Sequence, residues 1–141
     1  MKNLLAKKDI KAKIKIALKE DFGRYGDITS KVLISKKTRL KASIVAKENA
    51  IVCGTEFVVQ TFKALNSKIK IKVLKKDGSK VVKGNKIIDV DGDAQSILIA
   101  ERTALNFLGF MSGIATKQEN LLILQHLMEL KFIQREKQLL G

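Results

Sequence analysis

This sequence of 141 residues has no proline and no tryptophan, one cysteine and one histidine. The low numbers of cysteine and histidine limit the kinds of site that the chain can form. Cys53 is the one cysteine, so no internal disulfide and no cysteine-rich zinc site can form. The one histidine, His126, lies in a leucine-rich segment, where a lone histidine is more often incidental than catalytic. No apolar run approaches the roughly 18 residues of a membrane span, and lysines interrupt every apolar pair near the N-terminus. We therefore expect a cytoplasmic protein with no membrane partner.

Arginine is also scarce, which bears on the strongly basic charge. The chain has 28 Lys+Arg against 14 Asp+Glu and a formal net charge of +14, but only Arg24, Arg39, Arg102 and Arg135 are arginines. Nucleic-acid surfaces usually include arginine for bidentate contacts to phosphates and bases. Lysine richness of this kind favours a coding bias over a nucleic-acid surface, so we expect no nucleic-acid partner. A basic nucleic-acid-binding module stays as an alternative.

The hydrophobic pattern predicts an α+β domain with a mainly antiparallel sheet and flanking helices. Helical spacing of apolar residues, or alternation typical of strands, divides the chain into eight elements. The expected helices are 10–20, 55–65 and 94–115, and the expected strands are 40–47, 51–53, 68–74, 81–82 and 87–88.

Three finer expectations concern glycines and strand faces. Gly23 and Gly26 should end the first helix. In the strand from Leu40, the alternation predicts that Ser43 and Val45 face outward. The turn at Gly84-Asn85 predicts a hairpin. The surrounding DG..V..G..I pattern resembles that of biotinyl and lipoyl carrier domains, but the apolar flank of a modified lysine is missing. A generic hairpin is therefore the better interpretation, with a carrier domain as an alternative.

The most informative stretch is AERTALNFL, residues 100–108, which continues to SGIAT at 112–116. On a helix, Arg102, Asn106, Gly109 and Gly113 fall on one stripe that is polar or very small. Two interpretations fit the stripe. The glycines could permit a close helix contact, with Arg102 in an ordinary salt bridge. Alternatively, the Arg102 guanidinium could bind a carboxylate or phosphate in a bidentate manner.

Together with EDFGRYGDITS at residues 20–30, this stretch resembles quinolinate phosphoribosyltransferase, also called carboxylating nicotinate-nucleotide pyrophosphorylase. The resemblance covers about Ile10 to Thr116, with motifs at both ends. A molybdenum-locus relative shares the fold and is the alternative within the same fold, but the EDFGRYGDITS form favours the quinolinate enzyme.

The resemblance implies a fold, a reaction and one site residue. The family joins an N-terminal domain to a C-terminal α/β barrel, which we expect to be missing from this chain, and works as a homodimer. With Mg²⁺, it converts quinolinate and phosphoribosyl pyrophosphate to nicotinate mononucleotide, pyrophosphate and CO₂ for NAD biosynthesis. By the resemblance, Arg102 binds a quinolinate carboxylate in the partner subunit's barrel. The other site residues belong to the barrel, so we expect no catalytic residue, no metal ligand and no activity in this chain alone.

The segment after Thr116 departs from the family, which predicts a boundary between residues 1–116 and 117–141. Back-translation from Lys117 on, with one adenine restored after its codon, yields TRKFVDTATFNGIKIYS and then TRKTTPG, a motif of the family's barrel. In the restored frame, the second and third bases of each codon are dictated by the observed residues. Only the first base of each codon depends on the codons chosen for the back-translation. We therefore predict that this tail is out of frame. The alternative is a genuine C-terminal helix with Leu121, Leu124, Leu127, Met128 and Leu130 on its apolar face.

Overall fold

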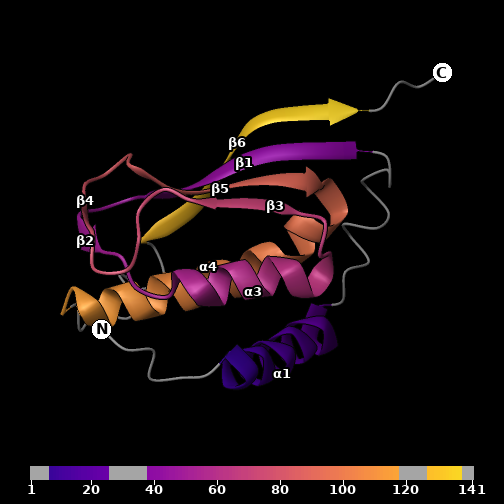
Figure 1. Cartoon of the computed structure of the whole chain (residues 1–141), viewed down its shortest axis with the longest axis horizontal. Helices are drawn as coiled ribbons and strands as arrows, with labels where there is room; N and C mark the ends of the chain where they lie inside the picture. The colour runs from indigo at the N-terminus through magenta and orange to yellow at the C-terminus, as the bar shows by residue number, and fades with distance from the viewer. Residues whose placement is uncertain (1–6, 26–37, 118–126, 138–141) are drawn as a thin grey trace.

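The computed structural model describes residues 7–25, 38–117 and 127–137, which form an α+β fold (Figure 1). Four antiparallel strands form the main sheet in the order β3-β5-β1-β6, and β2 pairs with β4 in a separate two-stranded sheet. The elements are α1 (Lys7–Tyr25), β1 (Thr38–Ala46), β2 (Ala50–Ile51), α3 (Thr55–Leu65), β3 (Lys70–Val73), β4 (Lys80–Val81), β5 (Lys86–Asp93), α4 (Ala94–Ala115) and β6 (Met128–Lys137). The predicted fold class is confirmed.

Helices α3 and α4 lie side by side along one face of the main sheet, and α1 lies against their outer side (Figure 1). The main core forms between sheet and helices, where Ile44, Phe62 and Leu108 have no exposed surface. A smaller cluster joins α1 to α3 through Ile10, Ile14, Leu18 and Phe57. The apolar stripe expected on the first helix is thus confirmed, and burial of such side chains contributes about 1.5–3 kcal/mol each.

Helix α4 is the one helix in the described part of the chain that is long and apolar enough, by length and composition alone, to cross a membrane. Nearly half of it is buried inside the protein, and Ile97, Ala104 and Leu108 are fully covered. Packing against the sheet and α3 therefore accounts for its apolar composition.

Two expectations about local structure are wrong. Helix α1 continues through Gly23 to Tyr25, because one interior glycine costs a helix only about 1 kcal/mol, which packing of the rest of α1 can offset. Gly26 lies outside the described residues. Ser43 and Val45 are buried at 0% and 4% exposure, because β1 is a central strand between β5 and β6. A central strand has less solvent-facing surface than simple alternation assumes.

The expected hairpin around Gly84 is also wrong. The chain does turn there, with Gly84 at a φ of +91°. However, β4 pairs with β2, whereas β5 pairs with β1 and β3, so the turn connects two different sheets. The strand expected at 68–74 is present as β3, which lies at the edge of the main sheet.

The C-terminal segment supplies a strand and not a helix between Met128 and Lys137. β6 pairs with β1 in an antiparallel register from Thr38–Lys137 to Ala46–Met128, and Leu127 and Met128 are buried. The helical alternative is therefore wrong for 128–137, which form a strand paired with β1. Leu121, Leu124 and His126 lie outside the described residues.

Candidate functional site: the two ends of helix α4

The N-terminal end of α4 is fixed by a cap at its first turn. The Asp93 carboxylate accepts hydrogen bonds from the Ser96 backbone N–H at 3.0 Å and from the Ser96 hydroxyl at 2.6 Å. Such a cap satisfies donors that the first helical turn leaves unpaired and contributes about 1 kcal/mol. Because Asp93 is also the last residue of β5, the cap sets the position of α4 relative to the sheet.

The polar stripe expected on α4 is divided between solvent and interior. Arg102 and Asn106 are exposed, whereas Gly109 and Gly113 are buried. Burial of the glycines supports the close packing that one interpretation expected. Arg102 is exposed, which fits both a surface salt bridge and contact with a ligand. The glycine packing is thus supported, and the role of Arg102 stays a prediction.

The exposed stripe continues toward the C-terminus of α4 with apolar side chains. Phe110 is 51% exposed and Ile114 is 59% exposed, at helical spacing from Asn106. The helix thus presents a polar end at Arg102 and an apolar end at Ile114.

A hydrogen bond between helices joins the two motifs that carry the family resemblance. The Thr103 hydroxyl donates to Asp21, although the two residues are 82 positions apart. Thr103 is buried, and it directly follows Arg102. Asp21 therefore holds α1 on the turn of α4 that presents Arg102. Sequence inspection found both motifs but could not show that they touch.

Glu101 flanks Arg102 on the other side and lies in a partly buried position. Burial raises the pKa of the Glu101 carboxyl above its ordinary value of 4.5. The carboxylate form is thus less favourable here than in water.

The C-terminal half of α4 is tied to the backbone that follows β2. The Ser112 hydroxyl accepts from the Cys53 N–H at 3.0 Å and donates to the Cys53 carbonyl at 3.1 Å. The Thr116 hydroxyl accepts from the Ile51 N–H at 2.9 Å and donates to the Ser112 carbonyl at 2.6 Å. The SGIAT motif therefore holds α4 against β2 by satisfying backbone groups of an irregular segment.

Gly54 lets this segment approach α4 closely. Its φ is +102°, in the left-handed region, and a Cβ there would lie 2.9 Å from the Met111 Sδ. Both the conformation and the contact require glycine. The neighbouring Cys53 is a poor nucleophile, because burial and then the Asp77 carboxylate raise the pKa of its thiol.

No group of three or more histidine, cysteine, aspartate or glutamate residues that could hold a metal occurs within 7–25, 38–117 and 127–137. Asp27, Thr29 and Ser30 of the EDFGRYGDITS motif lie outside those ranges. The described site is therefore an exposed arginine on a capped helix, supported by Asp21 and Thr103.

These features define an α+β domain that presents an exposed arginine on the longest of its described helices, and known proteins share this domain. The family described as "Quinolinate phosphoribosyl transferase, N-terminal domain" matches residues 27–112. The chain belongs to this family.

Individual relatives agree with the family match. The chloroplastic carboxylating nicotinate-nucleotide pyrophosphorylase of Arabidopsis thaliana is 43% identical over 108 residues, covering 77% of this chain and 31% of the relative. Quinolinate phosphoribosyltransferase 1b of Nicotiana tabacum is 44% identical with the same coverage. The solved nicotinate-nucleotide pyrophosphorylase of Francisella tularensis superposes with a TM-score of 0.74 at 32% identity, covering 81% of this chain and 40% of that structure. The chain thus spans about a third of the length of these curated relatives. Their names give no support to a carrier domain or a nucleic-acid-binding module.

Proposed function

We propose that this chain is the N-terminal part of a quinolinate phosphoribosyltransferase and that Arg102 binds a carboxylate of quinolinate. The reaction would join quinolinate to phosphoribosyl pyrophosphate, releasing pyrophosphate and CO₂ and forming nicotinate mononucleotide. The observation that carries the proposal is the exposed Arg102, held on a capped helix beside the Asp21–Thr103 hydrogen bond. An arginine held in this way can grip a planar carboxylate through two parallel hydrogen bonds.

The electrostatics of the chain support an anionic substrate. Quinolinate carries two carboxylates and phosphoribosyl pyrophosphate carries several phosphate charges, and the formal net charge of +14 favours their approach. The names of the relatives favour the quinolinate enzyme over the molybdenum-locus relative. Substrate tests on a complete protein separate these two.

The described residues contain no group of three or more histidine, cysteine, aspartate or glutamate side chains that could hold the Mg²⁺ of the reaction, so we assign it no ligand among them. Stabilisation of the departing pyrophosphate needs cationic groups and a metal close to it, which the remaining length of such an enzyme would supply. We further propose a cytoplasmic homodimer in which Arg102 reaches the partner subunit. By this proposal, the 141-residue chain alone forms no nicotinate mononucleotide, and clear turnover of quinolinate would refute it.

A second proposal concerns the origin of residues 117–141. We infer that the segment from Lys117 on is read out of frame through the loss of one adenine. Support comes from the sequence TRKFVDTATFNGIKIYS-TRKTTPG in the restored frame. Pairing of β6 with β1 does not conflict with this origin, because alternating apolar residues next to an open strand favour pairing whatever their history. Resequencing the gene tests it, and the absence of a TRKTTPG-encoding frame over codons 117–141 would contradict it.

The restored reading frame also provides the test of Arg102. In that protein, Arg102→Ala should raise the KM for quinolinate by about tenfold or more, the effect of losing a bidentate charged contact. Arg39→Ala is the matched control, since Arg39 is an exposed arginine on β1 whose guanidinium pairs with Asp91 at 3.2 Å. An unchanged KM and rate in Arg102→Ala would contradict its role, and equal losses in both variants would show a general charge effect.

A further inference from the structure

A groove of about 780 Å³ lies between α1 and α3, away from the exposed stripe of α4. Lys11, Lys15 and Lys19 line it from α1, together with Ile14 and Leu18, and the other side is formed by Gln60, Lys63, Ala64 and Ser67. The small side chains of Ala64 and Ser67 leave space opposite Ile14 and Leu18, which explains why the two helices do not close over it.

The three α1 lysines form a regular row without compensating charges. All three are exposed, no carboxylate lines the groove, and none of the described residues forms an ion pair with them. Their spacing of four residues places successive side chains about 6 Å apart along the helix. Lys63 differs, because its ammonium donates to the carbonyls of Ser67 at 3.1 Å and Ile69 at 2.6 Å. Glu56 lies one helical turn from the groove and accepts a hydrogen bond from Gln60.

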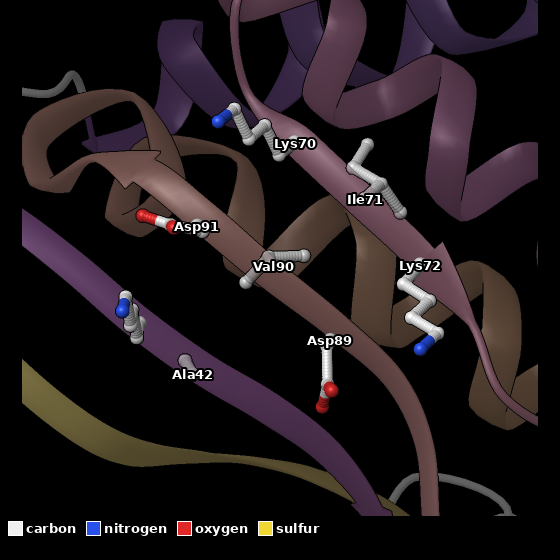
Figure 2. A pocket seen from close by; sticks show the side chains of 8 residues that line it. Ala42, Lys70, Ile71, Lys72, Asp89, Val90 and Asp91 are labelled. Atoms are coloured by element: carbon white, nitrogen blue, oxygen red, sulfur yellow. The ribbon is translucent and has the colours of Figure 1, made fainter.

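A second hollow, on the open face of the main sheet, is lined by both lysines and aspartates and serves as a comparison (Figure 2). There Lys70 and Lys72 of β3 stand across from Asp91 and Asp89 of β5, and Lys41 of β1 is also paired in register with Asp91. Opposite charges on neighbouring strands compensate one another. Among the described residues that line it, the groove beside α1 has no carboxylate to provide such compensation.

We propose that this groove binds an acidic, amphipathic helix of a partner protein. Glutamates at i, i+4 and i+8 on such a helix repeat at the same pitch of about 6 Å as the lysine row. Apolar side chains of the partner would contact Ala64 and the aliphatic stems of the lysines. The binding mode is that of a helix in a groove, and the lysine row determines which charge is accepted.

Other occupants fit less well. Two copies joined groove to groove would bring their lysine rows together, and the homodimer proposed above is placed at Arg102 of α4 and not at this groove. No aromatic side chain lines the groove to stack with bases, and a concave surface does not lie flat on a bilayer. These occupants are nevertheless included in the test.

The test uses the whole chain and a synthetic helix of about 18 residues, made of leucine and glutamate with the leucines on one face. Binding is measured by calorimetric titration at low and high salt. Lys11→Gln, Lys15→Gln and Lys19→Gln combined should weaken it by about tenfold or more, since three charged contacts are lost. The matched control combines Lys75→Gln, Lys76→Gln and Lys80→Gln, three exposed lysines near the opposite end of α3, where Asp77 bonds Thr55. It should change the affinity by less than about twofold.

Two comparisons make the result decisive. A peptide of the same composition without an apolar face should bind about tenfold more weakly, because it loses the contacts to the groove. Bound peptide should also protect Lys11, Lys15 and Lys19 of the unaltered chain from acetylation more than Lys75, Lys76 and Lys80, a readout that needs no variant to fold. Equal losses in both variants, equal binding of both peptides or equal protection would overturn the proposal. Tighter binding of single-stranded DNA, of anionic phospholipid vesicles or of a second copy would overturn it as well.

Discussion

The two halves of helix α4 differ in what the polar side chains of the family motif do. Around Arg102 and Asn106 the polar groups face solvent, whereas Ser112 and Thr116 bond to the backbone of Cys53 and Ile51. One continuous sequence stretch therefore contains an exposed binding end and a packing end. A motif that identifies a family need not have one physical role along its length.

The difference follows from what each half faces. The packing end lies against the last residue of β2 and the segment after it, where the Ile51 and Cys53 N–H groups donate to the hydroxyls of Thr116 and Ser112. The N-terminal half is held from other directions, by the Asp93 cap and by Asp21 of α1. The Asp93 cap and the Thr103–Asp21 hydrogen bond therefore fix the position of the turn that presents Arg102. Substitutions of side chains that bond the backbone at the packing end should therefore lower the free energy of unfolding more than substitutions on the exposed side of the N-terminal half.

The largest expected effect is at Gly54, on the packing end. Gly54→Ala should lower the free energy of unfolding by about 2–4 kcal/mol, because an alanine with positive φ is strained and its Cβ would lie 3.3 Å from the Met111 Cβ. Gly78→Ala is the control, since Gly78 also has a positive φ, +91°, but no atom within 4 Å of its Cβ position. It should cost about 1–2 kcal/mol in urea denaturation. Equal costs would mean that the contact with α4 is not tight.

Next in size is the loss of the Ser112 hydroxyl. Ser112→Ala should cost about 1–3 kcal/mol, because the Cys53 N–H and carbonyl both lose a partner in a largely buried place. Asn106→Ala, on the exposed side of the same helix, should change stability by less than about 0.5 kcal/mol. Both are measured by urea denaturation. A larger effect at Asn106 than at Ser112 would reverse the assignment of the two ends.

A smaller effect is expected at the tie between α1 and α4. Thr103→Val should cost about 1 kcal/mol, the net value of one hydrogen bond. Asp21→Ala, which removes the acceptor, should cost a similar amount, and the double variant should cost less than the sum of the two. Additive costs would show that the two side chains act independently, and α1 would then be held on α4 by its apolar cluster alone.

Sequence reasoning predicted the elements that repeat a pattern and missed those that depend on distant partners. The bounds expected for α3 and α4 agree with the structure, because each helix has long apolar periodicity and α4 also has a capping aspartate before it. The pairing of β4 with β2 depends on neighbours far along the chain, which no local pattern encodes. The strand at Met128–Lys137 was missed because Met128 and Leu130 also fit the apolar face of a helix, and only its pairing with β1 decides between the two.

The site shows the same limit. Arg102 was found because an arginine beside small residues on an otherwise apolar helix is unusual, and the structure exposes it; its role as a ligand for quinolinate stays a prediction. The Asp21–Thr103 bond was missed, since neither residue is unusual by itself. Ser112 and Thr116 were quoted for their likeness to the family, but only the structure shows that their hydroxyls satisfy the backbone after β2.

The smallest effect is a pH dependence at Glu101, in the exposed half. Burial raises the pKa of this carboxyl above 4.5, so the folded chain holds its proton more tightly than the unfolded chain does. Stability should consequently fall as the pH rises from about 4.5 through the folded pKa, because charging the carboxylate in the fold is unfavourable. Glu101→Gln removes this cost, so it should raise the melting temperature slightly at pH 7 and leave it nearly unchanged below the unfolded pKa. The contradicting result is a Gln variant that still melts at a higher temperature at pH 4 than at pH 7, by the same difference as the unaltered chain. That result would show that groups other than Glu101 cause the pH dependence.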